Sequence, residues 1–98
     1  MKVSIPHNLA KDEIIAKMKK VFDELKSEYA DDISIKEENW QDDMANFVAM
    51  AKGIKLKGAL KVLENSIDFD INIPMMLKPF ESQIREEFEK EFKKRILG

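Results

Sequence analysis

The chain has 98 residues, of which 44% are hydrophobic and 37% charged, with a formal net charge of -2 at pH 7. This length predicts one domain with a modest core, and the slightly acidic balance argues against a nucleic-acid binder, which usually carries a basic patch. The absence of cysteine excludes disulfides, thiolate metal ligands and cysteine nucleophiles. No apolar run is long enough for a transmembrane segment, and the N-terminus lacks the apolar core of a signal peptide, so we expect a cytoplasmic protein.

The N-terminal third of the chain predicts a short strand and a long helix. Val3 and Ile5 alternate with polar residues until Pro6, which cannot continue a strand interior. From about Leu9 to Tyr29, apolar residues recur at steps of three and four, the spacing of one helix face. This face consists of Ile14, Met18, Val21, Phe22, Leu25 and Tyr29.

A second strand is expected after the helix-breaking segment Ala30-Asp31-Asp32. Ile33 and Ile35 would face the core, and simple alternation would turn Glu38 outward to solvent. Trp40-Gln41-Asp42-Asp43 then forms a polar turn that leads into the next strand.

Three antiparallel strands follow, joined by two-residue hairpin loops at Lys52-Gly53 and Glu64-Asn65. The strands are Met44 to Ala51, Ile54 to Leu63 and Ser66 to Ile73. In this register Leu60 faces Ala45 and Phe69, and the core apolar residues share one face of the sheet. A slip by one residue would turn that apolar set to water, so the register is well specified.

After Pro74, an apolar connector, Met75-Met76-Leu77-Lys78-Pro79, leads to a C-terminal helix. Pro79 fits the first turn of that helix, where its missing N–H costs nothing. Apolar residues on the helix repeat at spacing four, and we expect this stripe to pack on the sheet as core. The stripe consists of Phe80, Ile84, Phe88, Phe92 and Ile96.

The element order β-α-β-β-β-β-α and the single apolar sheet face predict a two-layer α+β domain over residues 1–98. Both helices would pack on one face of a curved antiparallel sheet, a small helix-grip-like arrangement. We place the first strand at an edge of the sheet, beside the fifth.

No residue pattern indicates catalysis, a cofactor or a metal site. His7 is the single histidine and follows Pro6 in a turn, where a structural role near the helix start is expected. Gly53 and Gly58 lack the strand-loop-helix context of a phosphate loop. Paired aspartates such as Asp31-Asp32 are typical of solvated turns, and no converging oxygens are spaced for calcium or magnesium.

The middle of the inner sheet face combines small residues with large rings. Gly58 falls between Phe47 and Ile71 in the register. In one interpretation a ring covers the strand glycine and the core is filled. In the other, the sheet and the last helix enclose a hydrophobic pocket. The candidate pocket lining is Phe47, Gly58, Phe69, Phe88 and Phe92.

Two apolar groups lie outside the expected core, one on the outer face of the third strand and one in the connector. Together they form the candidate apolar contact surface, which consists of Met44, Val48, Met50, Met75, Met76 and Leu77. Methionine adapts to varied partners, so this surface is a candidate interface for a homodimer or for a lipid-like surface. Alternatively, the stems of Lys55 and Lys57 cover Val48 and Met50.

Several short features occur in a particular order along nearly the whole chain. They are Ile5-Pro6-His7 before the first helix, Trp40 in the acidic turn, Gly53 and Gly58 around the start of the fourth strand, and Ile73-Pro74-Met75-Met76-Leu77 followed by Phe80. In their order and spacing the chain resembles the family of putative polyhydroxyalkanoic acid system proteins. Ile73, Met75 and Ala10 depart from that family, in which we expect a leucine, an aromatic residue and a better helix cap.

The resemblance implies a link to the storage of polyhydroxyalkanoate, a hydrophobic polyester, and it implies no reaction or catalytic residue. The leading expectation is a non-enzymatic accessory protein that contacts a granule, a lipid-like ligand or a granule protein through its apolar surface. The alternative is a helix-grip carrier that holds an acyl chain or another hydrophobic small molecule between the sheet and the last helix. An enzyme of acyl substrates is the weakest hypothesis, since one histidine and no cysteine leave few catalytic groups.

Overall fold

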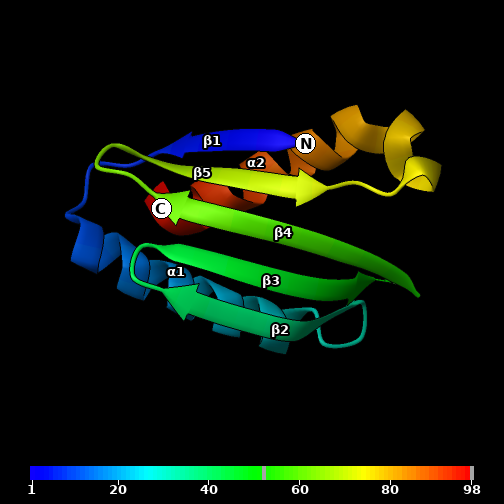
Figure 1. Ribbon diagram of the computed structural model, residues 1–98, viewed down its shortest axis with the longest axis horizontal. Coiled ribbons are helices and arrows are strands. Elements are labelled where there is room, and N and C mark those ends of the chain that lie inside the picture. Colours follow the sequence, from blue (N-terminus) through cyan, green and yellow to red (C-terminus); the bar gives the residue numbers. More distant parts are fainter. Residues whose placement is uncertain (52, 98) are drawn as a thin grey trace.

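The computed structural model describes residues 1–51 and 53–97, and these residues form an antiparallel sheet with two α-helices on one of its faces. The elements are β1 (Lys2–Pro6), α1 (Lys11–Glu28), β2 (Ile33–Gln41), β3 (Met44–Ala51), β4 (Ile54–Val62), β5 (Ser66–Asn72), the 3-10 helix η1 (Met75–Phe80) and α2 (Glu81–Leu97). In Figure 1, α1 lies behind β2 and β3, and α2 lies behind the half of the sheet that contains β1 and β5. The predicted α+β class and the helix placement are therefore confirmed.

The strand order is β1-β5-β4-β3-β2, and each neighbouring pair is antiparallel. β1 is an edge strand beside β5, as expected, and its Val3 and Ile5 pair with Phe69 and Ile67. All four of these side chains are buried, because the alternation of β1 turns Val3 and Ile5 toward the helices.

The predicted register of the three central strands is confirmed. Leu60 pairs with Ala45 on one side and with Phe69 on the other. The β4–β5 connection is closed by a hydrogen bond of 2.8 Å from the Leu63 N–H to the Ser66 carbonyl. In the β3–β4 loop, Gly53 has φ of 80°, a conformation that glycine adopts without steric cost, and Lys52 lies outside the described residues.

The expectation for the second half of β2 is wrong, because a β-bulge interrupts the alternation. Ile35 pairs with Ala49 but Glu37 pairs with Val48, so Lys36 is an extra residue. The insertion reverses the side-chain directions that follow. Glu38, predicted to face solvent, therefore points to the helix side of the sheet.

Trp40 also differs from the prediction. Trp40 and Gln41 belong to β2, and the turn consists only of Asp42 and Asp43. Trp40 pairs with Ala45 and packs against the core. The bulge again explains the difference, because it carries the indole to the apolar face.

The stripe predicted for the last helix is only partly buried. Ile96 and Phe92 are buried, Phe88 and Ile84 are half-buried, and Phe80 is 53% exposed and belongs to η1 with Pro79. With 3.6 residues per turn, residues four apart are offset by about 40° around the axis. A stripe of strict spacing four therefore winds away from the sheet, and its first residue leaves the core.

Candidate apolar contact surface

η1 forms the most exposed apolar part of the molecule. Pro74 ends β5, and the Leu77 N–H donates to the Pro74 carbonyl at 2.9 Å to begin the 3-10 turn. Met75 and Met76 are 88% and 68% exposed, and Phe80 is more than half exposed. Figure 1 shows η1 beyond the end of the sheet. We call Met75, Met76 and Phe80 the η1 tip.

Leu77 differs from the other residues predicted in the connector, because it is half-buried. Lys78, beside it, is exposed and lies 3.9 Å from a Glu81 carboxylate oxygen at the start of α2. Phe80 was assigned to the core from its spacing and was missed as a surface residue. The winding of a spacing-four stripe was the signal that could have placed it at the tip.

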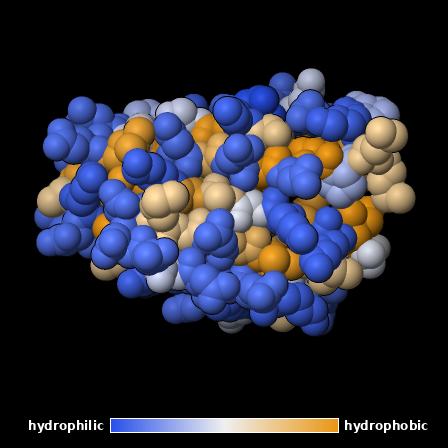
Figure 2. Space-filling model, viewed as in Figure 1, coloured by the Kyte–Doolittle hydropathy of each residue, from blue (hydrophilic) through white to orange (hydrophobic). Residues whose placement is uncertain are grey.

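The outer face of β3 presents the second predicted apolar group. Met44 is 48% exposed, while Val48 and Met50 are half-buried. Val48 pairs with Lys57 and Met50 with Lys55, the two lysines proposed to cover them. Figure 2 shows this face as mainly hydrophilic with separate apolar islands.

The six predicted contact residues therefore lie in different places. Met44 begins β3 at the sheet end that is remote from η1, as Figure 1 shows. Val48 is separated from β5 by Lys57, which pairs with Asn72 on its other side. Of the six residues, Met75 and Met76 are adjacent in sequence and both are strongly exposed.

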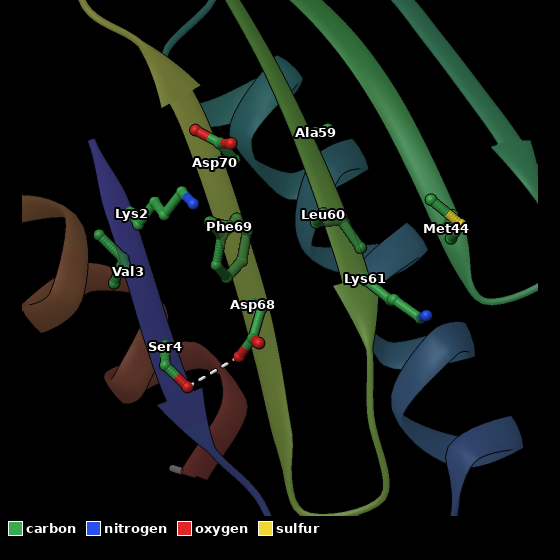
Figure 3. Close-up of a pocket in the computed structure, with 10 residues that line it drawn as sticks. All are labelled: Lys2, Val3, Ser4, Met44, Ala59, Leu60, Lys61, Asp68, Phe69 and Asp70. Atoms are coloured by element: carbon green, nitrogen blue, oxygen red, sulfur yellow. Dashed lines mark hydrogen bonds between the residues drawn. The ribbon is translucent and has the colours of Figure 1, made fainter.

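The outer face also contains a shallow groove of about 410 Å³ that sequence reasoning missed (Figure 3). It is lined by Lys2, Val3, Ser4, Met44, Ala59, Leu60, Lys61, Asp68, Phe69 and Asp70. Across it the Ser4 hydroxyl donates to Asp68 at 2.8 Å. A second hollow of about 310 Å³ shares Ala59 and Asp70. Ala59 is the small residue among the outward lysines of β4, and that contrast was an available signal.

The residues of the predicted pocket lining lie in two groups. The Phe47 ring lies over Gly58, so close that a Cβ added to Gly58 would be 2.4 Å from its Cζ atom. Phe69 contacts Phe88 and Phe92, with ring centroids 4.9 and 5.1 Å away. Phe88 and Phe92 are themselves stacked at 4.5 Å. These rings are in contact with one another, and the pocket that they were predicted to line stays a prediction.

His7 is buried and both of its ring nitrogens are hydrogen-bonded. Its Nε2 lies 2.8 Å from the Leu63 carbonyl, and its Nδ1 accepts from the Leu9 N–H at 3.2 Å. This pattern requires the proton on Nε2. The ring therefore connects the β4–β5 turn to the segment before α1.

Two ion pairs with shifted pKa values join α1 to the β2–β3 hairpin. A hydrogen bond of 2.8 Å to Glu38 raises the pKa of Lys26. A hydrogen bond of 3.2 Å from Lys11 lowers the pKa of Asp43. The other Glu38 oxygen accepts from the Trp40 indole N–H at 2.8 Å. These groups serve the packing of a helix on the sheet.

The described residues contain no cluster of three or more side chains that could hold a metal ion. Among the helices of the same residues, none is long and apolar enough to cross a membrane.

A comparison with known families gives a match over nearly the whole chain. The family model described as "Putative polyhydroxyalkanoic acid system protein" matches residues 1–96. The chain belongs to this family. No curated protein and no solved structure matches the chain.

For this member of the polyhydroxyalkanoic acid system family, the residues that carry the resemblance have separate structural positions. Pro6 ends β1 and precedes the buried His7. Gly58 lies beneath the Phe47 ring, and Met75 and Met76 are exposed on η1. Most of these features therefore shape the fold, whereas the two methionines face solvent.

Proposed function

We propose that the protein is a non-enzymatic accessory protein of polyhydroxyalkanoate storage and that its η1 tip contacts the hydrophobic granule surface. The observation that carries this proposal is the exposure of Met75 at 88% and Met76 at 68%, with Phe80, 53% exposed, at the other end of η1. The family match supports the storage context. A protruding apolar tip suits a soft apolar surface, and methionine side chains adapt to an irregular one.

The size of the tip predicts reversible contact. Full burial of a methionine or phenylalanine side chain contributes about 1.5–3 kcal/mol, and the loss of translational and rotational freedom opposes association. Three such side chains therefore support weak binding by one molecule and denser coverage at high protein concentration.

The proposal is tested by cosedimentation of the protein with polyhydroxyalkanoate particles. Met75→Asp with Met76→Asp should reduce the bound fraction about tenfold or more, because two charges would oppose entry into the polyester. Circular dichroism should show an unchanged fold, since both side chains face solvent. Unchanged binding by this double variant would remove the tip from the contact.

Met44→Asp is the matched control. Met44 is also an exposed methionine, but it lies on β3 at the sheet end remote from η1. It should leave particle binding unchanged. A loss of binding equal to that of the double variant would extend the contact to the outer face of the sheet.

The acyl-carrier alternative has less support. Phe69, Phe88 and Phe92 occupy the space between the sheet and α2 with centroid distances of 4.5 to 5.1 Å. A bound acyl chain would have to separate these rings and forgo their packing.

A further inference from the structure

β2 is one edge of the sheet. The hydrogen bonds between β3 and β4 show which backbone groups of β2 point away from β3, toward the open edge. The Val62 N–H donates to the Asp43 carbonyl at 2.8 Å. Because pairing alternates along antiparallel strands, the odd-numbered residues of β3 bond to β4 and the even-numbered ones bond to β2. The β2 residues opposite the odd-numbered ones direct their N–H and C=O groups to the open edge. They are Ile33, Ile35, Glu38 and Trp40, of which Ile33 already donates its N–H to the Tyr29 carbonyl at 2.7 Å.

β1, at the opposite edge of the sheet, has fewer backbone groups that are available to pair with another strand. β1 has five residues, and by the same alternation its outward backbone groups belong to Lys2, Ser4 and Pro6. Pro6 has no N–H, and Arg85 of α2 donates to the Lys2 carbonyl. β2, with nine residues, is the edge that can pair with another strand.

The bulge selects what can pair with β2. Ile35 and Glu38 both direct their backbone N–H and C=O groups to the open edge, and two residues, Lys36 and Glu37, lie between them. A regular strand has one residue between such positions, so it would lose register at the bulge. A second copy of β2, placed antiparallel about a two-fold axis, has the same two-residue interval at the same place.

We propose that two copies of this chain pair through their β2 edges, with Ile35 opposite Glu38 and Ile33 opposite Trp40 of the other copy. The two Ile35–Glu38 pairs would exchange two backbone hydrogen bonds each. The two Ile33–Trp40 pairs would form one each, because the Ile33 N–H already donates to the Tyr29 carbonyl, so the junction would hold about six in all. All four side chains lie on the helix side of the sheet, so the faces match across the junction. Both α1 helices would then lie on one side of a continuous sheet.

Charge complementarity supports this register. Lys36 and Glu37 are exposed, and neither forms an ion pair with any other residue that the structure describes. In the two-fold arrangement Lys36 lies opposite Glu37 of the other copy, and the pair occurs twice. Ser34 likewise lies opposite Asn39 on the outer face. The proposal is independent of the granule contact, because the η1 tip takes no part in it.

The first test is sedimentation equilibrium over a concentration series. The unmodified chain should reach twice the mass of one copy. Lys36→Glu should weaken association about tenfold or more, because two acidic side chains would then face each other across the junction, and Lys36→Glu with Glu37→Lys should restore it. A monomer at every concentration, or equal association by the single and double variants, would overturn the proposal. Lys57→Glu, on the outer face of β4, is the matched control and should associate normally.

The second test uses the absence of cysteine from the chain. A double variant, Ser34→Cys with Asn39→Cys, should form an oxidised dimer, because opposed residues in antiparallel strands lie within disulfide reach. The two positions are five residues apart on one strand, too far for a disulfide within one copy. Each single variant should stay uncrosslinked. Equal crosslinking by a single variant would refute this register.

Discussion

Phe47 and Gly58 depend on each other across β3 and β4. The ring occupies the volume that a side chain at position 58 would need, and an added Cβ would lie 2.4 Å from Cζ and 2.6 Å from Cε2. Contacts that close cannot persist, so either the ring or the strands must shift. Sequence reasoning identified this pair and left two outcomes open, and the observed contact is a ring placed over a strand glycine.

Gly58→Ala should therefore lower the free energy of unfolding by about 1–3 kcal/mol, the usual cost of overpacking a core. In a chain that already carries Phe47→Leu, Gly58→Ala should cost less stability than it does in the unmodified chain, because leucine lacks the Cζ atom that the new Cβ would meet. Urea denaturation of the four proteins gives the coupling between the two positions. Strictly additive effects would contradict a direct steric conflict.

His7 shows how one residue can connect two segments, the β4–β5 turn and the segment before α1. Its ring bonds to Leu63 and Leu9, and its backbone N–H donates to the Asn65 carbonyl at 3.0 Å. The position after a proline predicted a structural role near the helix start. The bonds to Leu63 and Asn65 could not be foreseen, because β1 meets the β4–β5 hairpin only in the folded sheet.

His7→Ala should cost about 1–3 kcal/mol of stability, because it leaves the partly buried Leu63 carbonyl and Leu9 N–H without the ring. Thermal unfolding measures the change, and Asn8→Ala serves as the control, since Asn8 is exposed. If both substitutions have the same small effect, the ring contributes no more than a surface side chain.

At the scale of elements, the two helices are joined by one charged group. Arg95 of α2 donates to Glu24 at 3.0 Å, to Glu28 and to Glu91 at 2.7 Å, and Tyr29 donates to the same Glu91 oxygen at 3.4 Å. The hydrogen bond from Arg95 lowers the pKa of Glu91 below its usual value of 4.5. Glu91 lies one helical turn before Arg95, but no spacing within either helix predicted the contacts with Glu24 and Glu28, which are remote in sequence.

The lowered pKa of Glu91 predicts a loss of stability in acid. A carboxyl group with a depressed pKa in the folded state stabilises the fold above its unfolded value of 4.5. The contribution is lost as the pH falls below that value and passes through the lowered pKa. Glu91→Gln should therefore be less stable than the unmodified chain at pH 7, and denaturation at acid pH should show a smaller difference. A constant difference at both pH values would contradict this.

At the scale of the whole molecule, the two sheet faces differ in what covers them. The helix side holds the core, which includes Phe69, Leu60 and Ile67. No helix of the described residues covers the opposite side, where Figure 2 shows hydrophilic surface with small hydrophobic areas between it, and this side also holds the shallow groove. Three of the exposed large apolar side chains, Met75, Met76 and Phe80, belong to η1, where the chain leaves β5. The fold thus separates its core from its candidate contact surface.

The amino-acid pattern alone determined the antiparallel meander and the face that holds the core. It could do so because strand alternation has a period of two, and a slip by one residue would expose every core side chain. Only the tertiary structure decided the bulge at Lys36 and the inward turn of Glu38 and Trp40. A bulge arises from the match between two strands, and that match is not local, so it is not written in the spacing of residues. For Phe80, the spacing of four shows that the apolar stripe turns around the helix axis, but only the position of the helix on the sheet decided which residue of the stripe leaves the core.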